Sequence, residues 1–281
     1  MIAPLPELLV EPVVRAALVE DLGRAGDVTA AACVPADARL SAVFVARSDG
    51  RIAGLDCARI AVRLMAPDAR FEAVLADGAD AAPGAVIARV EGNARALLAA
   101  ERVALNFLQR LSGVATLTRA YVRAVQGTGA RIADTRKTTP LLRALEKHAV
   151  LCGGGVNHRH GLDDAILIKD NHIAVCGGIG AALERARAAA GHLTKIEIEV
   201  DRLEQLQEAL PFRPDVVMLD NFALEDLRAA VAMAKDRTVL EASGGVNLNT
   251  VRAIAETGVD VISVGALTHS APALDIGLDA A

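Results

Sequence analysis

The chain has 281 residues, of which 53% are hydrophobic and 23% charged, a balance typical of a globular protein long enough for two domains. A formal net charge of −5, 2% aromatic residues and no tryptophan argue against a nucleic-acid-binding protein, which needs a basic surface and stacking side chains. The segment Met1–Glu20 fits neither a secretion signal nor a membrane span. We expect a soluble protein without nucleic-acid or membrane partners.

The four cysteines form no CxxC pair and are too scattered for a zinc pattern: Cys33, Cys57, Cys152 and Cys176. The simplest interpretation is reduced thiols, each acting as a small apolar residue. This favours a cytoplasmic location.

The first part of the chain has the pattern of an α+β domain. After a helical start come strand-like segments separated by turns, namely Leu40–Arg47, Arg51–Leu55, Phe71–Leu75 and Val86–Val90. An amphipathic pattern predicts a linking helix from Asn93 to about Ser112, which would end at Gly113. We expect a first domain over 1–112, a second over 113–267, and a tail, 268–281, packed on the first.

The second part alternates apolar runs with helical patterns, which indicates parallel strand pairing. The runs are Arg131–Asp134, Ala165–Lys169, Ile196–Val200, Val216–Asp220, Val239–Ser243 and Val261–Gly265. The helical patterns between later runs are Ile179–Ala190, Leu203–Leu210, Leu224–Ala234 and Leu248–Glu256. In a parallel barrel, functional groups gather where the strands end. Function is therefore sought at the polar tips of these runs.

Basic residues concentrate at three of the tips. The first run is followed by Asp134-Thr-Arg-Lys-Thr-Thr-Pro140, and two later motifs are Asn157-His-Arg-His160 and Lys169-Asp-Asn-His172. Together the three motifs contain two arginines, two lysines and up to three histidines that could converge. A solvated basic loop is the alternative interpretation of the first motif. Because like charges repel unless anions compensate them, the concentration predicts a multiply anionic substrate with carboxylates and phosphates.

Two carboxylates, Glu199 and Asp220, end successive apolar runs. They could bind Mg²⁺, face sugar hydroxyls or stabilise a developing cation; the alternative is an ion pair with Lys169 or Arg136, which does not exclude such a role. Glu197 points to the same side of its strand as Glu199, so we expect it to need a cationic neighbour and assign it no catalytic role.

Glycines mark the last two tips. Ser243-Gly244-Gly245 runs toward a helix, and Gly265-Ala266 follows the final run. Glycine lets the backbone approach an anion, and barrels often hold a phosphate between their last strands. A simple turn is the alternative for the glycine pair, but the two tips together predict a phosphate site.

With these motifs in place, the chain resembles the quinolinate phosphoribosyltransferase family over nearly its whole length. The resemblance is carried by Glu20–Thr29, Asp134–Pro140, Gly153–Arg159, Leu167–Ile173 and Glu241–Gly245. It implies an α/β fold class, with an N-terminal α+β sandwich domain and an incomplete, open α/β barrel of parallel strands. It also implies that quinolinate and phosphoribosyl pyrophosphate give nicotinate mononucleotide, CO₂ and pyrophosphate with Mg²⁺, in de novo NAD biosynthesis.

The resemblance also implies a role for each matching residue. The catalytic group is Lys137, Lys169, Glu199 and Asp220. The quinolinate carboxylates are held by Arg136, His158, Arg159 and Lys169, with Lys137 also serving pyrophosphate. Glu199 and Asp220 match the ribose and metal carboxylates. The region for the 5′-phosphate is Ser243, Gly244, Gly245, Gly265 and Ala266.

Arg102 matches an arginine that comes from the partner subunit of a homodimer, although its position alone suggests a surface salt bridge. Leu141 and His148 depart from the glycine and tyrosine that the family pattern leads us to expect. Neither change removes a catalytic group.

Three alternatives remain at this stage. A related transferase could act on a monocarboxylate or serve a metal-transport locus, but the full basic set favours a dicarboxylate. A lyase could use Lys169 as a Schiff-base amine. A catalytically dead binding protein is disfavoured because every expected charged residue is present.

Overall fold

The computed structural model describes residues 2–234 and 236–281. By contact density the chain forms two compact units. Unit 1 comprises the residues up to Arg119 together with Thr138–Gly154 and Leu267–Ala281, and unit 2 comprises Ala120–Lys137 and Gly155–Ala266.

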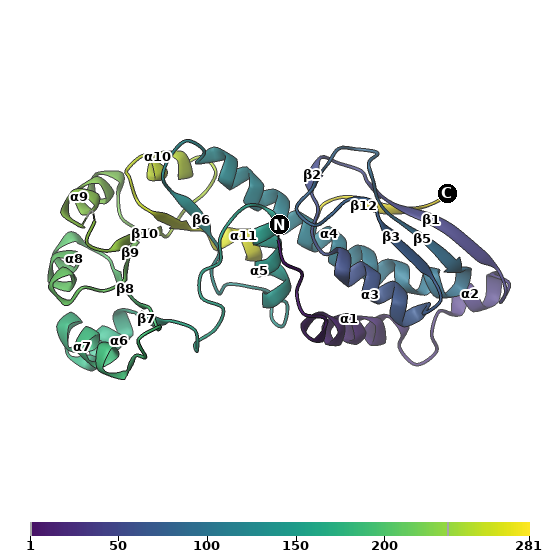
Figure 1. The fold of residues 1–281 in the computed structure, drawn as a ribbon, viewed down its shortest axis with the longest axis horizontal. Helices are drawn as coiled ribbons and strands as arrows, with labels where there is room; N and C mark the ends of the chain where they lie inside the picture. The colour runs from purple at the N-terminus through teal and green to yellow at the C-terminus, as the bar shows by residue number, and fades with distance from the viewer. Residues whose placement is uncertain (1, 235) are drawn as a thin grey trace. The chain divides into compact units, whose positions relative to one another are not determined.

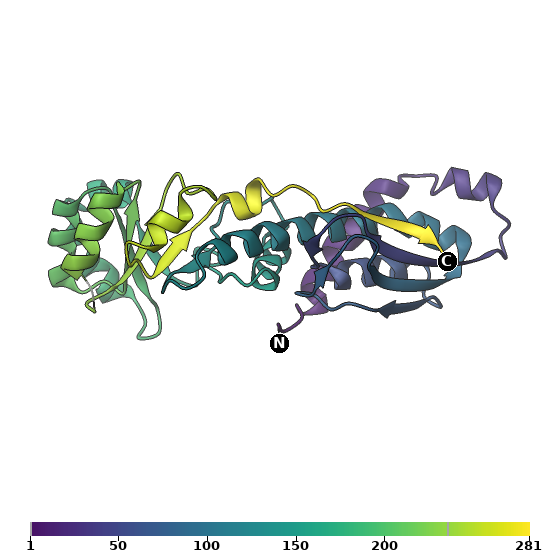
Figure 2. The ribbon, with the colours of Figure 1, turned by 90° about the horizontal axis from the view of Figure 1, so that it is seen from above.

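Unit 1 is built on an antiparallel sheet in the order β12-β1-β5-β3. Its strands are β1 (Arg39–Ala46), β3 (Arg70–Ala73), β5 (Val86–Asn93) and β12 (Ile276–Ala280), and a separate ribbon pairs β2 (Gly50–Arg51) with β4 (Asp80–Ala81). The C-terminal strand β12 lies along β1, with Phe44 opposite Leu278 (Figures 1 and 2). The end of the chain therefore completes the sheet formed near its beginning.

The helices of unit 1 are α1 (Glu7–Leu22), α2 (Val28–Cys33), α3 (Leu55–Met65) and α5 (Arg143–Cys152), together with most of α4 (Ala94–Ala124) and of α11 (Ala266–His269). The predicted strand Arg51–Leu55 was wrong, because Leu55 begins α3. The Asp77 carboxylate accepts hydrogen bonds from the main-chain nitrogens of Gly54 and Leu55, both at 3.1 Å. This side chain satisfies two donors at the helix start, a signal that lies too far along the chain to be read locally.

The predicted end of the linking helix at Gly113 was also wrong, since α4 continues to Ala124. An added Cβ at Gly113 would lie 2.0 Å from the carbonyl oxygen of Pro272. This glycine is explained by close packing of the helix against the tail, not by a helix end.

Unit 2 contains a six-stranded sheet in the order β6-β11-β10-β9-β8-β7, and its pairings are parallel. The strands are β6 (Arg131–Ala133), β7 (Ile166–Ile168), β8 (Ile196–Val200), β9 (Val216–Asp220), β10 (Val239–Ser243) and β11 (Val261–Ser263). The edge strands β6 and β7 do not pair with each other among the described residues, so the barrel is open. The predicted fold class is confirmed.

Helices line the outside of this sheet (Figure 1). They are α6 (Asp170–Cys176), α7 (Ile179–Ala189), α8 (Leu203–Ala209), the short 3₁₀ turn η1 (Leu210–Phe212), α9 (Leu224–Ala234) and α10 (Val251–Ala255), and α11 (Ala266–His269) follows the last strand. Short segments rich in apolar residues, separated by helical patterns, predicted the positions of these strands well.

Candidate active site

A cavity of about 410 Å³ opens at the carboxyl ends of the unit 2 strands. Many of the predicted site residues line it: Arg136, Lys137, His158, Arg159, Lys169, Glu199, Asp220 and Ser243. Parallel strands end at the same edge of a sheet, so tips far apart in the sequence meet here. The cavity thus brings the predicted cations and carboxylates together.

Asp134 fixes two of the loops that carry the cations. It is fully buried at the end of β6, where its carboxylate accepts hydrogen bonds from the main-chain nitrogen of His158 at 2.8 Å and from Asn157 Nδ2 at 2.6 Å. The Thr135 hydroxyl accepts from the main-chain nitrogen of Lys137 at 3.0 Å, which shapes the first loop. Sequence reasoning missed Asp134 and Asn157, although both lie inside the motifs it singled out.

Arg159 is prepared for an anion. Its Nη1 donates to the carbonyl oxygen of Ala165 at 3.1 Å, whereas its buried Nε has no hydrogen-bond partner among residues 2–234 and 236–281. Burial and the neighbouring Arg136 lower the pKa of Arg159, and Glu197 opposes that shift. A desolvated guanidinium beside a second one is stabilised when an anion binds both.

One histidine, not three, lines the cavity. His158 Nε2 lies 3.0 Å from Glu197 Oε2, and Arg159, whose pKa the charge of Glu197 raises, is the cationic neighbour that was expected. His160 is exposed, 4.0 Å from Asp164, and His172 Nδ1 accepts a hydrogen bond from the main-chain nitrogen of Lys169 at 2.9 Å. Of the up to three histidines expected, His158 is therefore the one that lines the cavity among the described residues.

The carboxylates of the cavity, Glu199 and Asp220, lie close to each other and to Lys169. Lys169 Nζ lies 2.8 Å from Glu199 Oε2, as the ion-pair alternative predicted. Burial and Glu199 raise the pKa of Asp220, while a hydrogen bond from Asn221 and the charges of the lysines oppose the rise. Contact with a carboxylate stabilises the lysine ammonium, whereas a Schiff-base lysine reacts as the free amine, so the lyase alternative is disfavoured.

Glu199 and Asp220 could hold a cation only together with other oxygens. Among the described residues, three-residue groups with metal-ligand geometry are Asp77, His148 and Cys152 in unit 1, and His158, Glu197 and Glu241 in unit 2. Neither contains Glu199 or Asp220. A pair of carboxylates that relies on substrate phosphates for its remaining ligands is, however, a common Mg²⁺ arrangement.

The glycine pair after β10 adopts positive φ angles, which glycine accepts without strain and other residues rarely adopt. Gly244 has φ +90°, and an added Cβ would lie 2.1 Å from Asn221 Oδ1, while Gly245 has φ +60° and open space around it. Asn221, missed by sequence reasoning, donates from Nδ2 to Asp220 Oδ2 at 2.7 Å. Its main-chain nitrogen donates to the carbonyl oxygen of Ser243 at 2.9 Å, which links the tips of β9 and β10. The helix after these glycines begins at Val251, later than its pattern predicted.

Five predicted residues lie outside the cavity lining. Gly244, Gly245, Gly265 and Ala266 follow the tips of β10 and β11 without lining the cavity within the described chain. Arg102 is exposed on α4 in unit 1 and forms no ion pair in the part of the chain that the structure describes. The surface salt bridge that its position suggested is therefore not observed.

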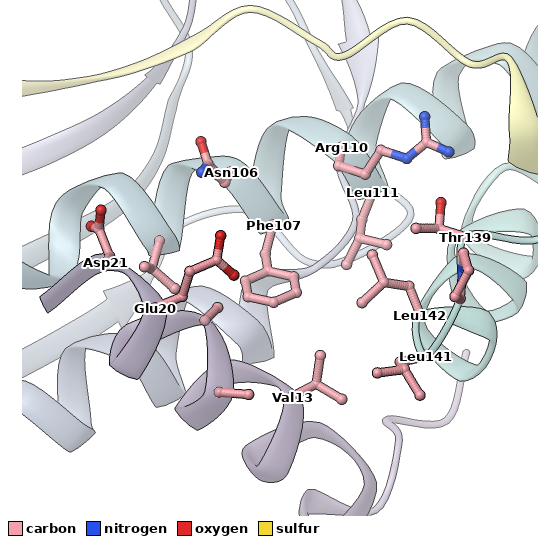
Figure 3. Close-up of a pocket in the computed structure, with 14 residues that line it drawn as sticks. Val13, Glu20, Asp21, Asn106, Phe107, Arg110, Leu111, Thr139, Leu141 and Leu142 are labelled. Atoms are coloured by element: carbon pink, nitrogen blue, oxygen red, sulfur yellow. The ribbon is translucent and has the colours of Figure 1, made fainter. Parts of the chain in front are cut away.

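A larger cavity, of about 540 Å³, lies in unit 1 between α1 and α4 (Figure 3). Apolar side chains such as Val13 and Phe107 line it, with Glu20 and Asp21 at one end. Its arginine, Arg110, is already bound to buried Glu146 at 2.8 Å. The cavity contains none of the predicted site residues, and the convergent cations of unit 2 mark the better candidate.

An open parallel α/β barrel with cations and carboxylates at its strand ends defines an enzyme class that handles phosphorylated, multiply anionic substrates. Family models agree: the quinolinate phosphoribosyl transferase N-terminal domain matches residues 27–112 and the C-terminal domain matches residues 114–279. The chain belongs to this family.

Individual relatives resemble the chain over most of its length. A Mycobacterium leprae nicotinate-nucleotide pyrophosphorylase (carboxylating) is 47% identical, covering 95% of both chains, and a probable enzyme of that name from Bacillus subtilis is 46% identical, covering 93% of this chain and 90% of the relative. The solved nicotinate-nucleotide pyrophosphorylase from Francisella tularensis superposes with a TM-score of 0.96 at 39% identity, covering 100% and 99% of the two chains. No helix within the described residues has the length and apolar character to cross a membrane.

Proposed function

We propose that the chain transfers the phosphoribosyl group of phosphoribosyl pyrophosphate to quinolinate, giving nicotinate mononucleotide, CO₂ and pyrophosphate in de novo NAD biosynthesis. One observation carries the proposal: Arg136, Arg159, Lys137 and Lys169 share a cavity with two carboxylates. The names of the relatives support the same reaction.

The cations hold the anionic groups of both substrates. Arg136 and Arg159 bind the quinolinate carboxylates, since paired guanidinium groups match planar carboxylates. Lys169 assists them, and Lys137, more exposed on its loop, also neutralises the departing pyrophosphate. Once the ring nitrogen is ribosylated it is cationic, and it stabilises the electron pair left when the adjacent carboxylate departs as CO₂.

The carboxylates face the sugar. As pyrophosphate leaves, positive charge develops on the ribose, and Glu199 and Asp220 stabilise that charge. They also fit Mg²⁺, because burial and the charge of Glu199 raise the pKa of Asp220, and a cation would relieve both effects. Bound Mg²⁺ would neutralise the pyrophosphate oxygens.

The 5′-phosphate lies at the glycine tips. Ser243 lines the cavity, and Gly244, Gly245, Gly265 and Ala266 continue from the neighbouring strand ends. Because α10 begins only at Val251, the donors are main-chain nitrogens of the loop itself.

Each active site is completed by a second copy of the chain. Arg102 is exposed and lacks an intrachain ion pair among the described residues, as suits an arginine that serves a neighbouring subunit of a homodimer. The reaction takes place in the cytoplasm, a location supported by four free cysteines of which Cys57 and Cys152 are buried.

The proposal is tested by incubating the protein with quinolinate, phosphoribosyl pyrophosphate and Mg²⁺ and measuring nicotinate mononucleotide, CO₂ and pyrophosphate. Equimolar formation of the three is expected. Nicotinate should replace quinolinate poorly, because the missing carboxylate leaves desolvated cations without a partner. Equal or faster turnover of nicotinate would favour the related-transferase alternative.

A further inference from the structure

Both ring nitrogens of His158 are engaged by protein groups. Nδ1 accepts a hydrogen bond from the main-chain nitrogen of Arg159 at 2.8 Å. Nε2 lies 3.0 Å from Glu197 Oε2 and 3.6 Å from Glu241 Oε1. The ring therefore lines the cavity while both of its nitrogens contact other residues of unit 2.

These contacts determine where the ring proton lies. An Nδ1 atom that accepts a hydrogen bond has a free lone pair, so the proton of the neutral ring is on Nε2 and is donated to Glu197. His158, Glu197 and Glu241 have the composition and spacing of a metal site. A protonated Nε2 cannot ligate a metal ion, so the hydrogen-bond pattern favours a proton at the centre of this group.

Burial of Glu197 and Glu241 lowers the stability of the folded protein. They lie on β8 and β10 and are only 7% and 4% exposed. Oε1 of each is buried without a hydrogen-bond partner among the residues that the structure describes. Buried carboxylates with incomplete partners destabilise a fold unless another gain compensates. Both carboxylates lie near His158 Nε2, so we look for the compensating gain in the function of His158 at the cavity.

His158 connects the carboxylates to Arg159. The Arg159 main chain is held by His158 Nδ1, and its guanidinium is held by the carbonyl oxygen of Ala165 at 3.1 Å. A change of tautomer at His158 would turn the Nδ1 acceptor into a donor, and a ring flip would put a C–H group in the place of Nδ1. Either change would break the first of these contacts. The placement of Arg159 at the cavity thus depends on the proton at Nε2.

We infer that Glu197, which accepts the hydrogen bond from His158 Nε2, and Glu241, whose Oε1 lies 3.6 Å from the same nitrogen, are positioning residues that favour the Nε2–H tautomer. His158 Nδ1 then fixes Arg159 for binding a dicarboxylate. The dicarboxylate part rests on the proposed function, whereas the tautomer part stands on the contacts alone. Loss of either carboxylate is expected to weaken quinolinate binding and to leave the affinity for phosphoribosyl pyrophosphate unchanged.

The test uses the full-length protein labelled with ¹⁵N-histidine. Long-range ¹H–¹⁵N spectra report the tautomer of each of the 6 histidines, and the His158→Gln variant assigns the relevant signal. We expect the neutral Nε2–H pattern in the unsubstituted protein and a mixture of tautomers in Glu197→Ala. Isothermal titration should show quinolinate binding weakened roughly tenfold in that variant, as for other groups that orient a binding side chain.

Matched variants separate positioning from structure. Glu197→Gln keeps an acceptor at the same reach and should retain the Nε2–H pattern, whereas Glu197→Asp is one methylene shorter and should lose it. These two variants carry the test if Glu197→Ala does not fold. Glu241→Ala should resemble Glu197→Ala, and Glu204→Ala, on the exposed side of α8, should leave spectrum and affinity unchanged.

Two results would overturn the inference. One is an unaltered His158 spectrum and quinolinate affinity in folded Glu197→Ala, Glu197→Asp and Glu241→Ala. The other is displacement of the Nε2 proton on addition of Mg²⁺ or Zn²⁺ to the unsubstituted protein, which would mark a metal site. If quinolinate is not turned over at all, the proposed function fails, and the spectra still decide the tautomer.

Discussion

At the scale of single residues, Leu141 occupies a backbone conformation that leucine rarely adopts. Its φ is +66° and the side chain is 90% exposed, so packing does not compensate the strain. The family pattern led us to expect glycine here, and the positive φ supplies the physical reason. The sequence showed the departure but not its cost, because φ cannot be read from composition.

Replacing Leu141 with glycine should therefore stabilise the protein. We expect a gain of up to about 1 kcal/mol, since relief of the left-handed strain exceeds the added freedom of the unfolded chain. Urea unfolding measures it. The matched control is Leu142→Gly, where φ is −95° and glycine should destabilise. Equal destabilisation by both substitutions would show that Leu141 is not strained.

Glu241 predicts a pH-dependent stability. Burial and the neighbouring Glu197 raise its pKa to about 7 from the ordinary 4.5, so the folded protein binds this proton more tightly than the unfolded chain. The stabilisation from this group is fully present below the pKa of Glu241 in the unfolded chain, and it is lost as the pH rises through the pKa of Glu241 in the folded protein. Its window therefore runs from about pH 4.5 to about pH 7.

Glu241→Gln imitates the protonated carboxyl and removes this titration. The free energy of unfolding of the variant, relative to that of the unsubstituted protein, should be higher at pH 8 than at pH 5. Chemical unfolding at both pH values measures it. A stability difference that is the same at both pH values would mean that Glu241 does not titrate with a raised pKa.

At the scale of elements, the buried parallel strands were the most predictable part of the fold. The runs Ile196–Val200, Val216–Asp220 and Val239–Ser243 coincide with β8, β9 and β10, because each is a short segment rich in β-branched and apolar residues. The end of α4 and the start of α3 were not predictable. Both depend on distant residues, Pro272 and Asp77, whose proximity exists only in the fold.

The strand tips carry a prediction for the phosphate. Gly244→Val, an obvious substitution, would clash with Asn221 and disturb the fold, so Gly245 is the better probe. Asparagine and aspartate both tolerate positive φ and have the same shape. Gly245→Asp should raise the KM for phosphoribosyl pyrophosphate at least about tenfold by charge repulsion, while neutral Gly245→Asn changes it far less. Equal KM values for the two variants would place the phosphate elsewhere.

At the scale of the whole molecule, each unit is made of segments that are not contiguous in the sequence. The contacts group Thr138–Gly154 and the C-terminal segment with unit 1, although these segments flank the strands of unit 2 in sequence. The cations of the site, by contrast, were found from sequence because they concentrate at strand ends. Asn221, Asp134 and Glu241 were missed because their roles are to hold other residues, and such roles need contacts.

The shared active site can be tested by complementation. Arg102→Ala and Lys169→Ala should each be nearly inactive. When an equal mixture of the two is unfolded and refolded, about half of the dimers contain one chain of each kind, and each such dimer has one intact site of two. About a quarter of normal activity should therefore return. A site built within one chain predicts no recovery. Heterodimers that form but remain inactive would return Arg102 to an ordinary surface charge.

The central claim is that the unit 2 cavity binds a dicarboxylate through its cations, among them the half-buried Arg136 and Arg159. The most direct measurement is isothermal titration of quinolinate into Arg159→Ala. We predict a loss of roughly 2–5 kcal/mol in binding free energy, as for other desolvated charge pairs. Arg131→Ala, at the exposed opposite end of β6, should bind normally. Unchanged quinolinate affinity in a folded Arg159→Ala would contradict the account.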